Sequence, residues 1–254
     1  MASQTPPQCH RPLVVRCGAF GDMVLLTALL RELHARWRQP VDIVTSGTWS
    51  EPLLRGQPGV GEVYALRSRK TPYWLAADQR LLVRRLRARG LSATWLCDDS
   101  EEMRRLLARA GVRAEAIVDV RDHALAAGEH ATAQWRRLAG VTPPLWAQRT
   151  PPGAFSGSEG CSLRVADEAF ADLHSWLERR GLADAPLILV QAGNKRTMRR
   201  GLKRLAKNHK YWPNERWAEV IGRVSADRPH ARIVLLGAGP EHALNAQIAA
   251  LAGV

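Results

Sequence analysis

Short apolar runs rich in β-branched residues alternate with longer amphipathic segments from residue 13 to residue 252. Parallel strands need a long crossover connection, usually a helix, so this alternation is typical of β-α-β units. The pattern predicts an α/β protein with doubly wound parallel sheets. Strands are expected at residues 13–17, 41–44, 63–66, 93–97, 116–120, 186–190 and 233–236, and helices at 22–36, 46–54, 74–89, 101–110, 123–138, 165–180, 215–224 and 241–252.

A segment containing four prolines separates two domains in this pattern. Residues 1–11 are expected to be a disordered tail, 12–140 an N-terminal Rossmann-like domain, 141–164 a linker, and 165–254 a C-terminal Rossmann-like domain. The second domain has two expected strands, whereas a doubly wound sheet usually has about five or six. Either the sequence is a fragment of a longer protein or the second domain is unusually small; the fragment is the favoured interpretation.

The charge balance is strongly basic, with 37 Lys and Arg against 24 Asp and Glu and a formal net charge of +13. Such an excess favours phosphate-rich partners: nucleic acid, an anionic membrane surface, a phosphorylated glycolipid or a nucleotide. Arginines spread over solvated helix faces would give the same total, so both explanations stay open at this point.

The cysteines and histidines indicate neither a metal site nor a disulfide framework. Cys9, Cys17, Cys97 and Cys161 form no CxxC pair, and the eight histidines show no ligand spacing. The sequence has neither a signal-peptide pattern nor an 18-residue apolar run. We therefore expect a cytoplasmic protein, with peripheral contact at the inner face of the cell membrane left open.

The first expected strand ends in a glycine turn, Gly18 to Asp22, at the start of a helix. Gly18 and Gly21 allow the backbone to approach a ligand closely. A carboxylate here would repel a phosphate, so Asp22 argues against a dinucleotide site. It suits either a helix cap or a general base acting on a hydroxyl.

The order of several segments is more specific than any one of them. LVVRCGAFGDMVLLTALLRELHARW, ATWLCDDSEEMRRLLARAGV, LILVQAGN, KYWPNERWAEV and IVLLGAGPEH follow one another along the chain. This set resembles glycosyltransferase family 9, which holds the lipopolysaccharide heptosyltransferases. The resemblance covers most of the sequence between residues 13 and 252.

The resemblance implies a GT-B architecture, in which the first domain mainly holds the acceptor and the second mainly holds the sugar-nucleotide donor. It implies an inverting glycosyltransferase that moves a heptose-like sugar from a nucleoside-diphosphate sugar, expected to be ADP-linked, to a lipopolysaccharide-core or related anionic glycolipid. No metal or cofactor is implied. A nucleic-acid-binding protein and an inactive glycan-binding paralogue are the alternatives, and no recognisable nucleic-acid reader motif is present in the sequence.

The resemblance also implies roles for particular residues. Asp22 matches the family's catalytic base, and Lys210 matches the lysine that neutralises the donor diphosphate. Gly193 and Asn194 match the strand end that meets the phosphates, and Glu241 matches an acidic residue near the donor ribose.

Two departures from the family pattern lie in the second domain. The family's Asp-(Ser/Thr)-Gly-x-x-His motif is absent from these 254 residues. The stretch from Lys195 to Lys210 is longer than usual and strongly basic, and either a phosphate clamp or a solvated segment would explain it. Its further basic residues are Arg196, Arg199, Arg200, Lys203, Arg204 and Lys207.

Most aromatic residues are expected in the core. Tyr73 and Trp74, beside Arg67, Arg69 and Lys70, are the exception, since they could instead form a surface platform for a glycolipid. The other expectations concern packing and capping: Trp37, Trp95, Trp135 and Trp176 as core residues, Ala166, Phe170, Leu173 and Leu177 as the buried face of helix 165–180, and Asn214 as a helix N-cap.

Overall fold

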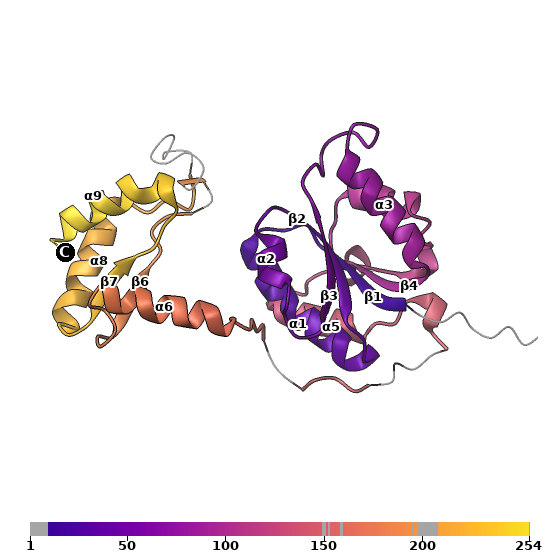
Figure 1. The fold of residues 1–254 in the computed structure, drawn as a ribbon, viewed down its shortest axis with the longest axis horizontal. Helices are drawn as coiled ribbons and strands as arrows, with labels where there is room; N and C mark the ends of the chain where they lie inside the picture. The colour runs from indigo at the N-terminus through magenta and orange to yellow at the C-terminus, as the bar shows by residue number, and fades with distance from the viewer. Residues whose placement is uncertain are drawn as a thin grey trace, which may run out of the picture. The chain divides into compact units, whose positions relative to one another are not determined.

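The computed structural model describes residues 10–148, 151, 153–157, 160–194, 196–197 and 208–253. The chain forms two compact units, residues 1–164 and residues 165–254. Each unit is built from parallel strands and helices in the alternating order that the sequence predicts (Figure 1). The boundary lies between Arg164 and Val165.

The first unit contains a five-stranded parallel sheet. Its strands are β1 (His10–Val15), β2 (Val41–Ser46), β3 (Val60–Leu66), β4 (Ser92–Leu96) and β5 (Ile117–Asp119), in the spatial order β3-β2-β1-β4-β5. β1 therefore begins at His10, inside the expected tail. The strand order reverses between β1 and β4, and ligands of doubly wound sheets bind at such a switch point, outside the carboxyl ends of the strands.

Helices cover both faces of this sheet, and two core clusters result. α1 (Phe20–Trp37) and α5 (Ala131–Gly140) pack on one face. α3 (Ala77–Arg89) and α4 (Glu101–Arg109) pack on the other. Because both faces are covered, strand residues that point to either face are buried, among them the apolar Leu13, Val14, Val15, Ile43 and Trp95.

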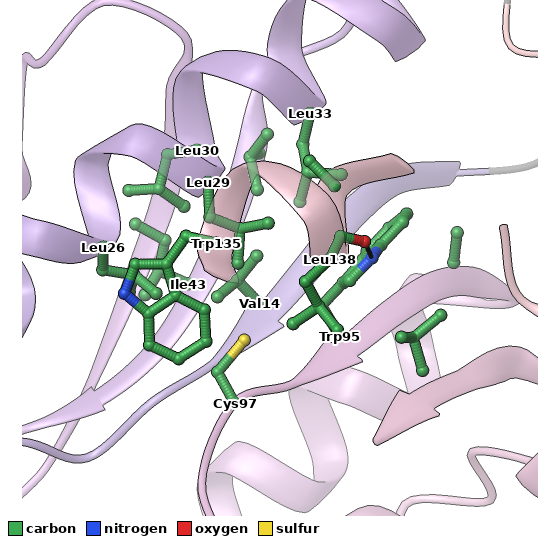
Figure 2. Packing of buried hydrophobic residues seen from close by; sticks show 14 of the residues in the cluster. Val14, Leu26, Leu29, Leu30, Leu33, Ile43, Trp95, Cys97, Trp135 and Leu138 are labelled. Atoms are coloured by element: carbon green, nitrogen blue, oxygen red, sulfur yellow. Dashed lines mark hydrogen bonds between the residues drawn. The ribbon is translucent and has the colours of Figure 1, made fainter. Parts of the chain in front are cut away.

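The first core cluster joins α1 and α5 to the sheet (Figure 2). The indole Nε1 of Trp95 donates to the carbonyl of Leu138 at 3.1 Å, so a buried polar atom is satisfied inside the cluster. Trp37, Trp95 and Trp135 are all buried there, as predicted. The leucines that α1 turns toward the sheet are Leu26, Leu29, Leu30 and Leu33.

The remaining elements of the first unit are short. They are α2 (Ser50–Leu54), η1 (Ala114–Ala116), η2 (Val120–His123) and η3 (Pro144–Trp146). The helix expected from residue 123 begins only at Ala131, because Gly128 adopts a φ of +77° that interrupts helical geometry.

The described residues 153–157 and 160–164, expected to be part of a linker and here called the strap, lie along α1. Glu32 is fully buried, and its carboxylate accepts hydrogen bonds from the backbone N–H of Ser156 at 2.8 Å and from its hydroxyl at 2.6 Å. The Thr27 hydroxyl accepts the N–H of Ser162 at 3.0 Å. This strap therefore packs as part of the first unit.

The second unit contains a two-stranded parallel sheet of β6 (Leu187–Val190) and β7 (Arg232–Leu235). Its helices are α6 (Asp167–Arg179), α8 (Asn214–Asp227), η5 (Gly239–Glu241) and α9 (His242–Ala252). A small core forms between the sheet, α8 and α9 around Ala192, Ile221, Leu244 and Ile248.

Two packing predictions for this unit are wrong. The expected buried face of α6, formed by Ala166, Phe170, Leu173 and Leu177, contains no buried residue, and Phe170 is 57% exposed. Periodicity identifies the apolar face of a helix but does not supply an element that covers it. Trp176 is only partly buried, beneath the Arg180 guanidinium.

Asn214 does not cap α8. Pro213 occupies the capping position, and Asn214 is the first helical residue. The buried Asn214 side chain instead accepts from the Tyr211 hydroxyl at 3.0 Å and donates to the side chain of Gln247 at 2.9 Å. Asn214 therefore links α8 to α9.

Candidate functional site

A cluster of polar side chains lies at the switch point of the first sheet. Asp98, which follows β4, is almost completely buried. One carboxylate oxygen of Asp98 accepts the N–H of Cys17 at 2.9 Å, and the other accepts the N–H of Ser100 at 2.9 Å. Arg69, which follows β3, donates to the Cys17 carbonyl at 3.1 Å and lies 3.4 Å from the Asp98 carboxylate. Asp98 and Arg69 therefore fix the turn that follows β1.

Asp22 lies in the first turn of α1, at the end of this fixed segment. Its Oδ2 accepts the N–H of Ala19 at 2.6 Å, so the carboxylate caps the helix start. Its side chain remains 41% exposed. The helix-capping interpretation is thus observed, and the exposure leaves the carboxylate accessible to a hydroxyl group in solution.

Gly18 is required by this arrangement, since a Cβ atom at that position would lie 2.6 Å from the Cβ of Asp22. Gly21 is not, because an added Cβ there would meet no atom within 4 Å. The turn therefore has no room for a side chain at position 18, whereas it has room at position 21. A role for Gly21 in ligand approach stays a prediction.

Arg16 supplies a cation beside Asp22. Its Nη2 lies 3.6 Å from Oδ1 of Asp22, and its Nη1 donates to the Cys97 carbonyl at 2.7 Å. The guanidinium also lies over the Trp135 ring, 5.7 Å from its centroid. Three partners therefore hold Arg16 in place.

The Cys17 thiol, inside the same turn, is a poor nucleophile. Burial, followed by the nearby Asp98 carboxylate, raises the pKa of Cys17 to about 11. The thiol is therefore protonated near neutral pH, and its sulfur contacts the Met103 sulfur at 3.7 Å.

The loop between β3 and α3 is fixed by two side chains of α3. Asp78 accepts the N–H groups of Arg67 at 2.9 Å and Ser68 at 3.0 Å. Burial raises the pKa of Asp78, but the hydrogen bonds from Ser68, Arg67 and Gln79 outweigh that effect and hold it below its usual value. The Gln79 amide donates to the carbonyls of Ser68 and Thr71 at 2.7 and 2.8 Å.

In the second unit, Glu241 connects the loops that follow β6 and β7. It is 2% exposed, and its two oxygens accept from the Thr197 hydroxyl at 2.5 Å and from the N–H of Ala238 at 2.9 Å. A Cβ atom on Gly193 would lie 1.8 Å from a Glu241 carboxylate oxygen, so any larger residue there would displace this buried carboxylate. The carboxylate faces the protein in this conformation, and its contact with a donor ribose stays a prediction.

Asn194 and Lys210 lie together at the carboxyl end of β6. The Asn194 amide donates to the Lys210 carbonyl at 3.4 Å, and its Oδ1 accepts from the Asn208 amide at 3.1 Å. Lys210 itself is exposed. The structure therefore gathers Gly193, Asn194, Lys210 and Glu241 around one strand end of the second unit.

Most of the basic stretch between Lys195 and Lys210 falls outside the described residues. Of its members, Arg196 and Lys210 are described, whereas Lys195, Arg199, Arg200, Lys203, Arg204 and Lys207 are not. The clamp interpretation of this stretch stays a prediction.

Sequence reasoning missed Arg16 and Asp98, and it considered Arg69 only as a neighbour of the possible platform at Tyr73 and Trp74. Each of the three lies at or just after the end of a strand in the first sheet. The carboxyl ends of parallel strands lie at one edge of a sheet. The polar residues that directly follow each expected strand could therefore have been predicted to lie together at that edge.

Across the described ranges, no three His, Cys, Asp or Glu side chains gather closely enough to hold a metal ion. None of the described helices has both the length and the apolar character needed to cross a bilayer.

Comparison with known proteins gives matches among solved structures only. No family model matches the sequence, and no curated protein matches it. A glycosyl transferase of family 9 from Veillonella parvula superposes with a TM-score of 0.71 at 16% identity, covering 95% of this chain and 66% of that one. E. coli ADP-heptose LPS heptosyltransferase II gives a TM-score of 0.62 at 20% identity, covering 94% and 68%.

A third match is E. coli heptosyltransferase WaaC with ADP-2-deoxy-2-fluoro heptose, with a TM-score of 0.59 at 20% identity over 94% of this chain and 73% of that one. The chain therefore has the α/β fold of these GT-B glycosyltransferases. The resemblance expected from the sequence is confirmed at the level of the fold. This chain spans about two thirds of the length of the first two structures.

Proposed function

We propose that this chain belongs to an inverting glycosyltransferase that transfers a sugar from a nucleoside-diphosphate donor to an acceptor hydroxyl. The observation that carries the proposal is the exposed Asp22 carboxylate, held at the switch point of the first sheet with Arg16 beside it. The fold shared with solved glycosyltransferases supports it. The basic charge would also suit nucleic acid, but the fold comparisons do not favour that alternative.

In the proposed reaction, Asp22 accepts the proton of the acceptor hydroxyl as its oxygen attacks the anomeric carbon of the donor sugar. The new glycosidic bond forms while the bond from the anomeric carbon to the diphosphate oxygen breaks. A single displacement inverts the configuration at that carbon. The nucleoside diphosphate leaves with the bonding electrons and carries the developing negative charge.

The second unit would bind the donor. Lys210 is an exposed cation at the end of β6, where it could neutralise the leaving diphosphate. Gly193 and Asn194 would offer the neighbouring backbone. We propose an ADP-linked, heptose-like sugar, because heptosyltransferase WaaC was solved with ADP and with an ADP-heptose analogue.

The first unit would bind the acceptor. We propose a lipopolysaccharide-core or related anionic glycolipid, which suits the net charge of +13. A cytoplasmic location with peripheral contact at the inner membrane face would bring the protein to such an acceptor.

A thermal-shift series with ADP, GDP, UDP and CDP tests the donor half. ADP should stabilise the protein most, because a ligand that binds only the folded state raises the melting temperature. Lys210→Met should reduce that shift, whereas Lys70→Met, a change of another exposed lysine, should not. No response to any nucleoside diphosphate in the full-length protein would contradict the proposed donor site.

A further inference from the structure

The loop from Arg67 to Ala76 exposes large apolar side chains among basic residues. Trp74 is 73% exposed and Leu75 is 59% exposed. In Figure 1 the chain between β3 and α3 forms a loop that projects beyond the end of the sheet. Exposed apolar side chains that lie next to each other and are rimmed by polar residues can mark an interaction site, whereas scattered ones need no explanation.

Contacts to the backbone of this loop and to the Tyr73 ring order the segment that carries Trp74 and Leu75. The Arg80 guanidinium donates to the Trp74 carbonyl at 2.6 Å, and the Arg109 guanidinium lies 4.5 Å from the centroid of the Tyr73 ring. Asp78 and Gln79 anchor the earlier part of the loop. Trp74 and Leu75 are therefore exposed on an ordered loop.

The charges around this loop are almost all positive. Residues 67–89 contain eight Lys and Arg residues and one acidic residue, Asp78. Both carboxylate oxygens of Asp78 accept hydrogen bonds from the loop itself, so they are not directed at an external partner. Arg67 and Lys70 are exposed on the loop.

A shallow groove of about 210 Å³ adjoins the loop, and Arg67, Leu81 and Arg85 are among its lining residues. Glu51 and Asp78 also line it, but Glu51 pairs with Arg55 and Asp78 accepts hydrogen bonds from Arg67 and Ser68. The groove thus offers two guanidinium groups next to an apolar surface. A lipid phosphate beneath a hydrocarbon layer has the matching chemistry.

We propose that residues 67–76, with the adjoining groove, form a docking surface for an anionic phospholipid bilayer. Trp74 and Leu75 enter the interface between head groups and acyl chains, a region that tryptophan favours. Arg67, Lys70 and Arg85 contact the lipid phosphates. The biological purpose of this docking surface rests on the proposed function, for which it would be the part of the protein that meets the membrane.

The position of the loop fits this purpose. Arg69, in its middle, donates to the carbonyl of Cys17 in the turn that leads to Asp22. A membrane at Trp74 would therefore lie near the proposed acceptor side of the first unit, where the head group of a lipid-anchored acceptor could reach Asp22.

Vesicle co-sedimentation of the full-length protein tests the assignment. Vesicles of phosphatidylcholine and phosphatidylglycerol in equal amounts should bind the protein, and vesicles of phosphatidylcholine alone should bind it much more weakly. The Trp74→Ser/Leu75→Ser variant should bind the anionic vesicles about tenfold more weakly or worse. Leu125→Ser, which changes another exposed leucine of the same unit, should bind as the wild type does.

Charge-reversal variants test the electrostatic part of the proposed membrane binding. Lys70→Glu should weaken anionic-vesicle binding about tenfold, with a further loss at high salt. Arg113→Glu, a reversal at an exposed position outside the loop, should change it about twofold or less. Equal losses in the loop variants and their controls, or equal binding to both vesicle types, would overturn the assignment. So would binding of a soluble phosphorylated glycan by this loop without vesicle binding.

The ADP thermal shift distinguishes this assignment from the proposed function. Lost vesicle binding in Trp74→Ser/Leu75→Ser with an unchanged ADP shift supports the docking surface. An ADP shift in a wild-type protein that does not bind vesicles would reject the surface and leave the donor site intact. Vesicle binding at the loop without any nucleotide response would reject the donor site alone.

Discussion

The Nη2 atom of Arg16 lies 3.6 Å from Oδ1 of Asp22, while Nη1 of the same guanidinium donates to the carbonyl of Cys97 at 2.7 Å. Arg16 directly follows β1, and Asp22 lies in the first turn of α1. The carbonyl of Cys97, directly after β4, holds the Arg16 guanidinium in place. Attraction between the two charges orients the exposed carboxylate at the switch point. We interpret Arg16 as a positioning residue for Asp22.

Arg16→Met should lower kcat about tenfold and leave the KM for the donor unchanged, because a displaced general base loses its geometry without affecting donor binding. Arg16→Lys should recover part of kcat by retaining the charge. Steady-state kinetics and a melting curve for each variant check this. A kcat for Arg16→Met equal to that of the wild type would rule out the positioning role.

Gly193→Ala should separate the loops that follow β6 and β7, because its Cβ would lie 1.8 Å from the Glu241 carboxylate. We expect a loss of about 1–3 kcal/mol in the free energy of unfolding and a reduced ADP shift. Gly222→Ala in α8 is the control. Its added Cβ meets no atom within 4 Å, and alanine should stabilise the helix by about 0.5–1 kcal/mol.

Glu32→Ala should loosen the strap at residues 153–157 and 160–164, because it removes the carboxylate that accepts from the N–H and the hydroxyl of Ser156. The free energy of unfolding should fall by about 1–3 kcal/mol, and cleavage within the strap by a non-specific protease should become faster. Glu115→Ala, at an exposed position, should change neither quantity. Unchanged protease resistance in Glu32→Ala would show that other contacts hold the strap.

Burial raises the pKa of Cys17 to about 11, so its thiolate forms only at high pH. In a Cys9→Ser background, iodoacetamide near neutral pH should alkylate the exposed Cys161 well before Cys17. Peptide mass spectrometry over time follows both sites. Faster labelling of Cys17 than of Cys161 would contradict the buried, protonated thiol.

The same shift has a consequence for stability. The folded state binds the Cys17 proton more tightly than the unfolded chain, whose thiol titrates near 9.0. The contribution of the protonated Cys17 thiol to the free energy of unfolding is therefore fully present below pH 9.0, and it is lost as the pH rises toward about 11. Urea unfolding of the wild type and Cys17→Ala across this range should show a smaller pH-dependent loss in the variant.

The order of strands and helices could be predicted from the sequence because the three central strands of the first sheet, β1, β2 and β4, are buried at most positions. Their short β-branched and aromatic runs stand out in the sequence, and the helices between them carry one apolar face. The turn from Gly18 to Asp22 was found for the same reason, since it lies between two clear elements. Helix ends were less predictable, as the late start of α5 after Gly128 shows.

The contacts that complete the candidate site could not be predicted, because they join loops far apart in the chain. Arg69 and Asp98 meet at Cys17 through the strand order β3-β2-β1-β4-β5, which periodicity does not determine. The burial of Glu241 and the exposure of Phe170 likewise depend on tertiary packing.

The general-base role of Asp22 is tested most directly by single-turnover transfer from an ADP-heptose to a lipopolysaccharide-core acceptor in the full-length protein. Asp22→Asn keeps the size of the side chain but removes the base, so transfer should fall about a thousandfold while the ADP thermal shift is retained. Asp122→Asn, at an exposed position in η2, should transfer as the wild type does. Transfer by Asp22→Asn at the wild-type rate would contradict the account.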